Sequence, residues 1–152
     1  MKLERLETIT KEDINTYYRL SRDAKVRRYC ILAYANNPEK ANQKLQKFLS
    51  DSSITFYKIM LDNVFVGYFI LINKWSITQI IVVIGEEYRN KGYATEAIKK
   101  LKDILTPKSN ELQRFIIDTD NTASLALALK ANLKKAGTYV SANYDTMTIW
   151  DL

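Results

Sequence analysis

A chain of 152 residues, 47% of them apolar, can bury the core of one compact domain spanning residues 1–152, and it has no apolar run long enough to cross a membrane. It contains no histidine and a single cysteine, Cys30, which excludes Ser-His or Cys-His catalysis, histidine-ligated metals and an internal disulfide, so we expect no metal site. The net charge of +6 favours an anionic partner, although scattered basic residues argue against nucleic acid, and the missing signal-peptide core predicts a cytoplasmic protein.

The first part of the chain is predicted to hold one strand and three helices. Residues 2–8 alternate as a strand, and Thr10 followed by acidic residues is typical of a helix N-cap for a segment ending near Arg22. A second helix is expected over Lys25–Tyr34. Asn37-Pro38 places a proline at the first position of a third, lysine-rich amphipathic helix.

Three consecutive strands are predicted next. The apolar runs Ile54–Leu61 and Val64–Ile72 are separated by Asp62-Asn63, a two-residue pair typical of a hairpin turn. The two runs should therefore pair antiparallel. A third strand, Ile77–Ile84, follows directly.

The hexad Arg89-Asn90-Lys91-Gly92-Tyr93-Ala94 leads from this strand into an amphipathic helix that continues to Leu105. The first backbone N–H groups of a helix have no partner within it, and the aligned peptide dipoles place partial positive charge there. Gly92 lets the backbone approach a phosphate, while Arg89 and Lys91 add mobile charge. The junction predicts a diphosphate site; the alternative is an ordinary turn in which Gly92 only permits a bend.

The last part of the chain is predicted to hold one helix and three strands. A loop is expected at residues 107–110, then a strand over Leu112–Asp118. Asn121 is a predicted N-cap for the helix Thr122–Ala131, which should stop at Asn132, a residue that tolerates left-handed backbone. Two final strands are expected, Lys134–Val140 and Tyr144–Trp150.

The motif Arg89-x-x-Gly92-x-Ala94 before one helix, with Asn121-x-x-Ser124 at the start of the next, resembles the GCN5-related N-acetyltransferases (GNAT). The stretch Asp23–Tyr29, with the helix after Pro38, is similar to the branch of ribosomal-protein N-terminal and spermidine acetyltransferases. The resemblance implies an α/β fold: a mixed, mostly antiparallel central sheet flanked by about four helices. It also implies that strands Ile77–Ile84 and Leu112–Asp118 splay apart.

The resemblance implies acetyl-coenzyme A as the cofactor. Backbone amides of residues 90–95 would hold its diphosphate, and residues 82–84 would hydrogen-bond its pantetheine arm, as in the addition of a strand to a sheet edge. Asn121 and Ser124 would contact that arm too. Helix capping is the alternative role for Asn121 and Ser124. The implied cofactor-binding residues are Val82, Val83, Ile84, Arg89, Asn90, Lys91, Gly92, Tyr93, Ala94, Thr95, Asn121 and Ser124.

The implied reaction is direct attack of a primary amine on the acetyl thioester. The amine would belong to a small molecule, a peptide N-terminus or a lysine. A backbone N–H around Val83 or Ile84 would stabilise the oxyanion. The helix after Asn121 lacks the tyrosine that many relatives use as general acid, because Ala128 stands there. Gln79 stands where many relatives have a glutamate base, and an amide cannot accept a proton near pH 7.

Other candidates for the proton-transfer roles are Asp118, at the end of the neighbouring strand, and Tyr144, on the last hairpin. These departures leave an alternative function open, a non-catalytic module that binds acyl-coenzyme A and regulates a partner. The sequence does not identify the acceptor. It also leaves the oligomeric state open, with a homodimer among the alternatives.

Overall fold

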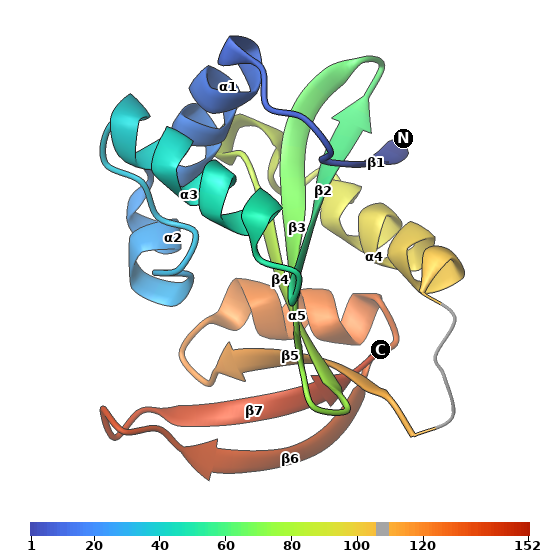
Figure 1. Cartoon of the computed structure of the whole chain (residues 1–152). Helices are drawn as coiled ribbons and strands as arrows, with labels where there is room; N and C mark the ends of the chain where they lie inside the picture. The colour runs from blue at the N-terminus through green and yellow to red at the C-terminus, as the bar shows by residue number, and fades with distance from the viewer. Residues whose placement is uncertain (106–109) are drawn as a thin grey trace.

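A computed structural model describes residues 1–105 and 110–152 and shows a mixed sheet with helices on both faces (Figure 1). In the described residues the sheet has seven strands: β1 (Lys2–Arg5), β2 (Ile54–Leu61), β3 (Val64–Lys74), β4 (Ile77–Ile84), β5 (Leu112–Asp118), β6 (Lys134–Val140) and β7 (Thr146–Asp151). Five α-helices are described, against about four expected: α1 (Lys11–Ser21), α2 (Ala24–Tyr29), α3 (Pro38–Ser50), α4 (Tyr93–Ile104) and α5 (Thr122–Lys130). A short 3-10 helix, η1 (Glu86–Tyr88), precedes α4.

The sheet order is β1-β2-β3-β4-β5-β7-β6, and every neighbouring pair is antiparallel except β4 and β5. The predicted mixed, mostly antiparallel sheet is confirmed. None of the described helices has both the length and the apolar character needed to cross a membrane. Of the loop predicted at residues 107–110, residues 107–109 lie outside the described part of the chain.

The helix starts follow the predicted caps. Thr10 and Asp13 form a capping box at α1, in which each side chain accepts a hydrogen bond from the other residue's backbone N–H. The Asn37 side chain caps α3 through Lys40 N at 2.8 Å. α2 is shorter than predicted and ends at Tyr29, because the backbone of Cys30 leaves the helical region and its carbonyl accepts from a following turn instead.

Left-handed backbone marks the turns. Asp62 and Asn63 both have positive φ, 47° and 65°, as a two-residue hairpin turn requires, so the predicted β2–β3 hairpin is confirmed. Asn132, with φ of 57°, ends α5 as expected. Tyr144 has φ of 65° and belongs to the turn before β7, so that strand begins at Thr146 and not at Tyr144. The first strand is also shorter than predicted: β1 ends at Arg5, and Leu6 N makes one further hydrogen bond to β2, to Phe56 O at 2.9 Å.

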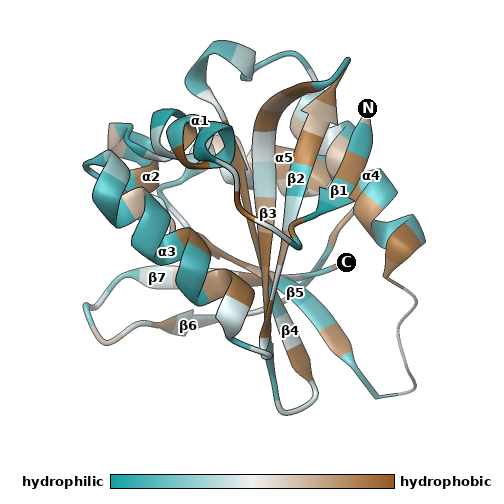
Figure 2. Ribbon diagram, turned by 45° about the horizontal axis from the view of Figure 1, so that its top comes forward, coloured by the Kyte–Doolittle hydropathy of each residue, from teal (hydrophilic) through white to brown (hydrophobic). Residues whose placement is uncertain are grey.

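The sheet divides the core into two clusters, one on each of its faces. Helices α1, α2 and α3 cover one face, where Tyr17, Phe48, Phe56 and Tyr68 form an aromatic group. Helices α4 and α5 cover the other face, where Ile98, Leu101 and Ala128 are buried (Figure 1). Apolar residues are concentrated on the central strands, while the outer faces of the helices are hydrophilic (Figure 2).

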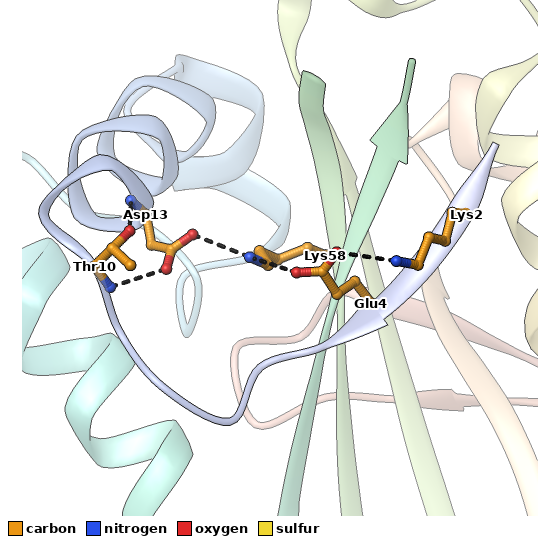
Figure 3. A network of polar contacts seen from close by, with 5 residues as sticks. All are labelled: Lys2, Glu4, Thr10, Asp13 and Lys58. Carbon is orange, nitrogen blue, oxygen red and sulfur yellow. Dashed lines mark hydrogen bonds and ion pairs between the residues drawn. The ribbon is translucent and has the colours of Figure 1, made fainter. Parts of the chain in front are cut away.

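Lys58 on β2 joins β1 and α1 to the sheet (Figure 3). Its ammonium lies 3.0 Å from a carboxylate oxygen of Glu4 and 3.2 Å from one of Asp13. Burial disfavours the charged form, but hydrogen bonds to the two carboxylates outweigh that effect and raise the pKa of Lys58. The network ties β1 and the first turn of α1 to β2.

Strands β4 and β5 pair only at their beginnings. Three residue pairs join them: Ile77 with Leu112, Thr78 with Gln113, and Gln79 with Arg114. Beyond Gln79 the two strands diverge, while β4 stays paired with β3 and β5 with β7. The predicted splayed pair is confirmed, and we call the opening between the strands the wedge.

Candidate active site

Backbone groups of β4 face the wedge without a strand partner. Gly85 N donates to Val66 O at 3.0 Å, and hydrogen-bonded residues alternate along an antiparallel pair, so Val83 bonds to β3 and its neighbours do not. Val82 and Ile84 therefore turn their N–H groups toward the side that β5 has left. Of the two residues considered for an oxyanion donor, only Ile84 has its N–H on the wedge side.

The start of α4 forms an anion cradle, residues 92–95, with unpaired backbone donors. Gly92 has left-handed backbone, φ of 83°, and no side chain caps the helix. Within the described residues, no hydrogen bond is donated by the backbone N–H groups from Gly92 to Thr95. A Cβ at Gly92 would meet no atom within 4 Å, so the space in front of the backbone is open. This arrangement suits an anion that approaches the main chain closely.

Arg89 holds the cradle in place instead of lying free beside it. Its Nε donates to Ile84 O at 2.9 Å, and its Nη2 donates to Asp23 Oδ2 at 2.5 Å. Both side chains are largely buried, 22% exposed for Arg89 and 16% for Asp23. Lys91 donates to Glu87 O at 2.9 Å. The mobile charge expected of Arg89 and Lys91 is thus engaged in contacts within the protein.

A cavity of about 370 Å³ opens in front of the cradle, and we call it the α4 cavity. Its walls come from α2, the end of β4, the residues before and at the start of α4, and one face of α5. The structure brings all the predicted cofactor residues except Lys91 to this cavity: Val82, Val83, Ile84, Arg89, Asn90, Gly92, Tyr93, Ala94, Thr95, Asn121 and Ser124. Their contact with a cofactor remains a prediction.

A second cavity of about 280 Å³ occupies the wedge, and we call it the wedge cavity. Gln79 and Asp118 line it from the two diverging strands. Tyr144 lines neither cavity and its side chain is 89% exposed. The two cavities adjoin, because they share the lining residues Tyr29, Cys30, Val82, Asn121, Ser124 and Leu127.

The two cavities differ in charge. Lys25, Arg89 and Lys130 line the α4 cavity, and among the described residues no carboxylate does. Asp118 and Asp145 line the wedge cavity, where the one cation among the described lining residues, Arg28, is paired with Asp120 outside the lining. The electrostatic field therefore favours an anion in one cavity and a cation in the other.

Sequence reasoning missed two residues of the site. Tyr29, the last residue of α2, lies where the cavities meet, and Asp145 lies in the turn before β7. Hydrogen bonding from Tyr29, with further bonds from Arg28, lowers the pKa of Asp120. The available signal is the basic run Lys25-Val26-Arg27-Arg28-Tyr29, a pattern that is also typical of a solvated helix face.

Of three other residues at the junction, Asn121 and Cys30 have their chemistry restricted and Ser124 does not. The Asn121 side chain accepts from Ser124 N at 3.3 Å, so the capping role is present. The Ser124 hydroxyl is not used in that bond and lines both cavities. Burial raises the pKa of Cys30 to about 11, which keeps the thiol protonated and a poor nucleophile at neutral pH.

Comparisons with known proteins agree with this geometry. The family model described as Acetyltransferase (GNAT) domain matches residues 5–134. A GNAT-family acetyltransferase from Bacillus anthracis superposes with a TM-score of 0.80 at 17% identity, covering 100% of this chain and 95% of that one. A chimera of the Vibrio cholerae spermidine N-acetyltransferase SpeG and hSSAT gives 0.77 at 15% identity, with 100% and 95% covered. AAC(6')-Ib in complex with ribostamycin and coenzyme A gives 0.77 at 14% identity, with 99% and 93% covered. No curated protein matches the sequence significantly.

Proposed function

Because the chain belongs to the GNAT acetyltransferase family, we propose that it transfers the acetyl group of acetyl-coenzyme A to a primary amine of a small molecule held in the wedge cavity. The observation that carries this proposal is the pair of adjoining cavities with opposite charge. One suits a polyanionic cofactor and the other suits an ammonium group. Their junction is where the two reacting groups would meet.

The α4 cavity fits acetyl-coenzyme A. The open space at Gly92 and the unpaired N–H groups that follow it match a diphosphate. The wedge-facing backbone groups of Val82 and Ile84 match the amide-bearing pantetheine arm. When bound, this cofactor supplies an activated acetyl thioester.

A small amine is the acceptor class that the wedge cavity supports best. A volume of about 280 Å³ is at the small end of the range for ligand pockets, which favours a compact molecule over a protein segment. The carboxylates of Asp118 and Asp145 would attract its positive charge. A spermidine acetyltransferase and the AAC(6')-Ib complex with ribostamycin are among the similar structures, which supports this class.

Three groups of the chain can assist the transfer. The Ile84 N–H points into the wedge and would donate to the thioester carbonyl oxygen, a contribution worth about 3 kcal/mol when well aimed. Asp118 would accept the amine proton, directly or through a water that Gln79 orients. The Tyr29 hydroxyl, at the junction, would leave its hydrogen bond to Asp120 and return a proton to the leaving sulfur.

The test is acetyl transfer to a panel containing a polyamine, an aminoglycoside and a peptide with a free N-terminus. Asp118→Asn and Tyr29→Phe should each lower kcat by about a hundredfold or more and leave the dissociation constant of acetyl-coenzyme A unchanged. Tyr144→Phe is the matched control and should keep full activity, because Tyr144 lines neither cavity. Cofactor binding without transfer to any acceptor would instead support the non-catalytic module.

A further inference from the structure

One face of α5 forms a shelf along the α4 cavity. Ala123, Ala126 and Lys130 follow a spacing of three and four residues, which places them on the same side of the helix, and all three line the cavity. The two alanines leave room beside the helix, and Lys130 stands at the end of the row. Lys25, in the first turn of α2, lines the same cavity from another wall.

Lys25 and Lys130 differ from Arg89, because no described ion pair engages their positive charges. Arg89 is engaged by Asp23 and by Ile84 O, and Lys91 lies outside the lining. In the described part of the chain, neither Lys25 nor Lys130 takes part in an ion pair. The cavity wall therefore includes two lysines outside any described ion pair, besides the backbone donors of residues 92–95, which already suit a diphosphate.

We propose that Lys25 and Lys130 bind the 3′-phosphate of coenzyme A while its adenosine lies on the shelf of Ala123 and Ala126, so that the protein selects against cofactors lacking this phosphate. The inference rests on the proposed function, because it concerns the same cofactor. A phosphomonoester carries close to two negative charges at pH 7, which two ammonium groups neutralise.

The test compares the dissociation constants of coenzyme A and dephospho-coenzyme A by calorimetry. The wild-type protein should bind coenzyme A on the order of ten- to a hundredfold more tightly, and added salt should shrink this ratio. Lys25→Met and Lys130→Met should each weaken coenzyme A and leave dephospho-coenzyme A unchanged. Lys134→Met, an exposed lysine on β6 outside both cavities, is the matched control and should keep the wild-type ratio.

A second variant tests the shelf separately from the charges. Ala126→Phe should weaken coenzyme A and dephospho-coenzyme A by the same factor, because it occupies the space of the nucleoside, and should leave binding of phosphopantetheine unchanged. A wild-type ratio near one, or a ratio that both methionine variants preserve, overturns the inference and leaves the proposed function standing. Failure of the wild-type protein to bind either nucleotide overturns both.

Discussion

Gly92 is the single residue on which the anion cradle depends most. Its backbone has positive φ, where an L side chain costs roughly 1–2 kcal/mol, and the space in front of it is open to a ligand. Any other residue would place a Cβ in the space that a phosphate oxygen would take. Side chains next to Gly92, by contrast, are engaged elsewhere in the protein.

Gly92→Glu should abolish the stabilisation of the protein by acetyl-coenzyme A, because it adds bulk and negative charge at the cradle. The measurement is the thermal shift on adding cofactor, together with the melting temperature without it. Gly137→Glu is the matched control, since a Cβ at Gly137 also meets no atom within 4 Å but lies on β6, away from both cavities. An unchanged cofactor shift in Gly92→Glu would rule out the cradle as the diphosphate site.

At the scale of the secondary-structure elements, helix α2 connects the two sides of the wedge. Asp23 caps the helix through Lys25 N and Val26 N and pairs with Arg89 before α4. Near the other end of the helix, Arg28 pairs with Asp120 before α5. A helix of only six residues is thus attached at both ends to the segments that begin the two helices of the site.

Asp23→Asn should separate the contribution of the ion pair with Arg89 from the contribution of the helix cap. Asparagine caps helices about as well as aspartate, so α2 should persist, while the largely buried Arg89 loses its counter-charge. We expect a loss of about 1–3 kcal/mol in the free energy of unfolding and a several-fold weaker affinity for acetyl-coenzyme A. Urea unfolding and calorimetry measure the two effects.

The matched comparison for this variant is Arg28→Met, which removes the exposed pair at the other end of α2. Exposed pairs contribute at most about 1 kcal/mol, so its stability should change little. If both variants lowered stability equally, burial of the Asp23–Arg89 pair would not be the reason for its effect.

Local signals in the sequence predicted the ends of helices and the turns better than contacts between residues far apart in the chain. Asp62-Asn63, Asn121 and Asn132 were placed correctly because caps and turns depend on residues within a few positions. The role of Arg89 was not predictable, since its partner Asp23 is 66 residues away in the chain. Asp145 joins Asp118 only because β7 pairs with β5, a contact that no short pattern reports.

At the scale of the whole molecule, the sheet consists of two parts that meet at three residue pairs. Strands β1 to β4 form one part, strands β5 to β7 the other, and the wedge opens where the pairing stops. The α4 cavity is lined from both sides of this opening, by β4 and α4 on one and by α5 on the other. A ligand there would bridge the two parts.

Acetyl-coenzyme A at a hundredfold excess over its dissociation constant should therefore stabilise the fold by about 2.7 kcal/mol, or roughly 5–10 °C in melting temperature. Amide exchange should slow at Val82 and Ile84, at residues 92–95 and in α5. Hydrogen exchange with mass or NMR detection measures this. Amides of β2 that exchange through global unfolding should slow by the global stabilisation alone, whereas the unpaired amides of the site should gain protection of their own. Unchanged exchange at Val82, Ile84 and residues 92–95 would contradict a bridging ligand.

The contact between Asp23 and Arg89 also constrains how this protein can diverge. A simple salt bridge survives when its two charges trade places, but Arg89 additionally donates to Ile84 O. An aspartate at position 89 has no donor for that carbonyl, and an arginine at position 23 cannot cap α2 as Asp23 does. Descendants of this chain can therefore lose the pair or keep it. An exchange of the two residues would remove both the hydrogen bond to Ile84 O and the cap of α2.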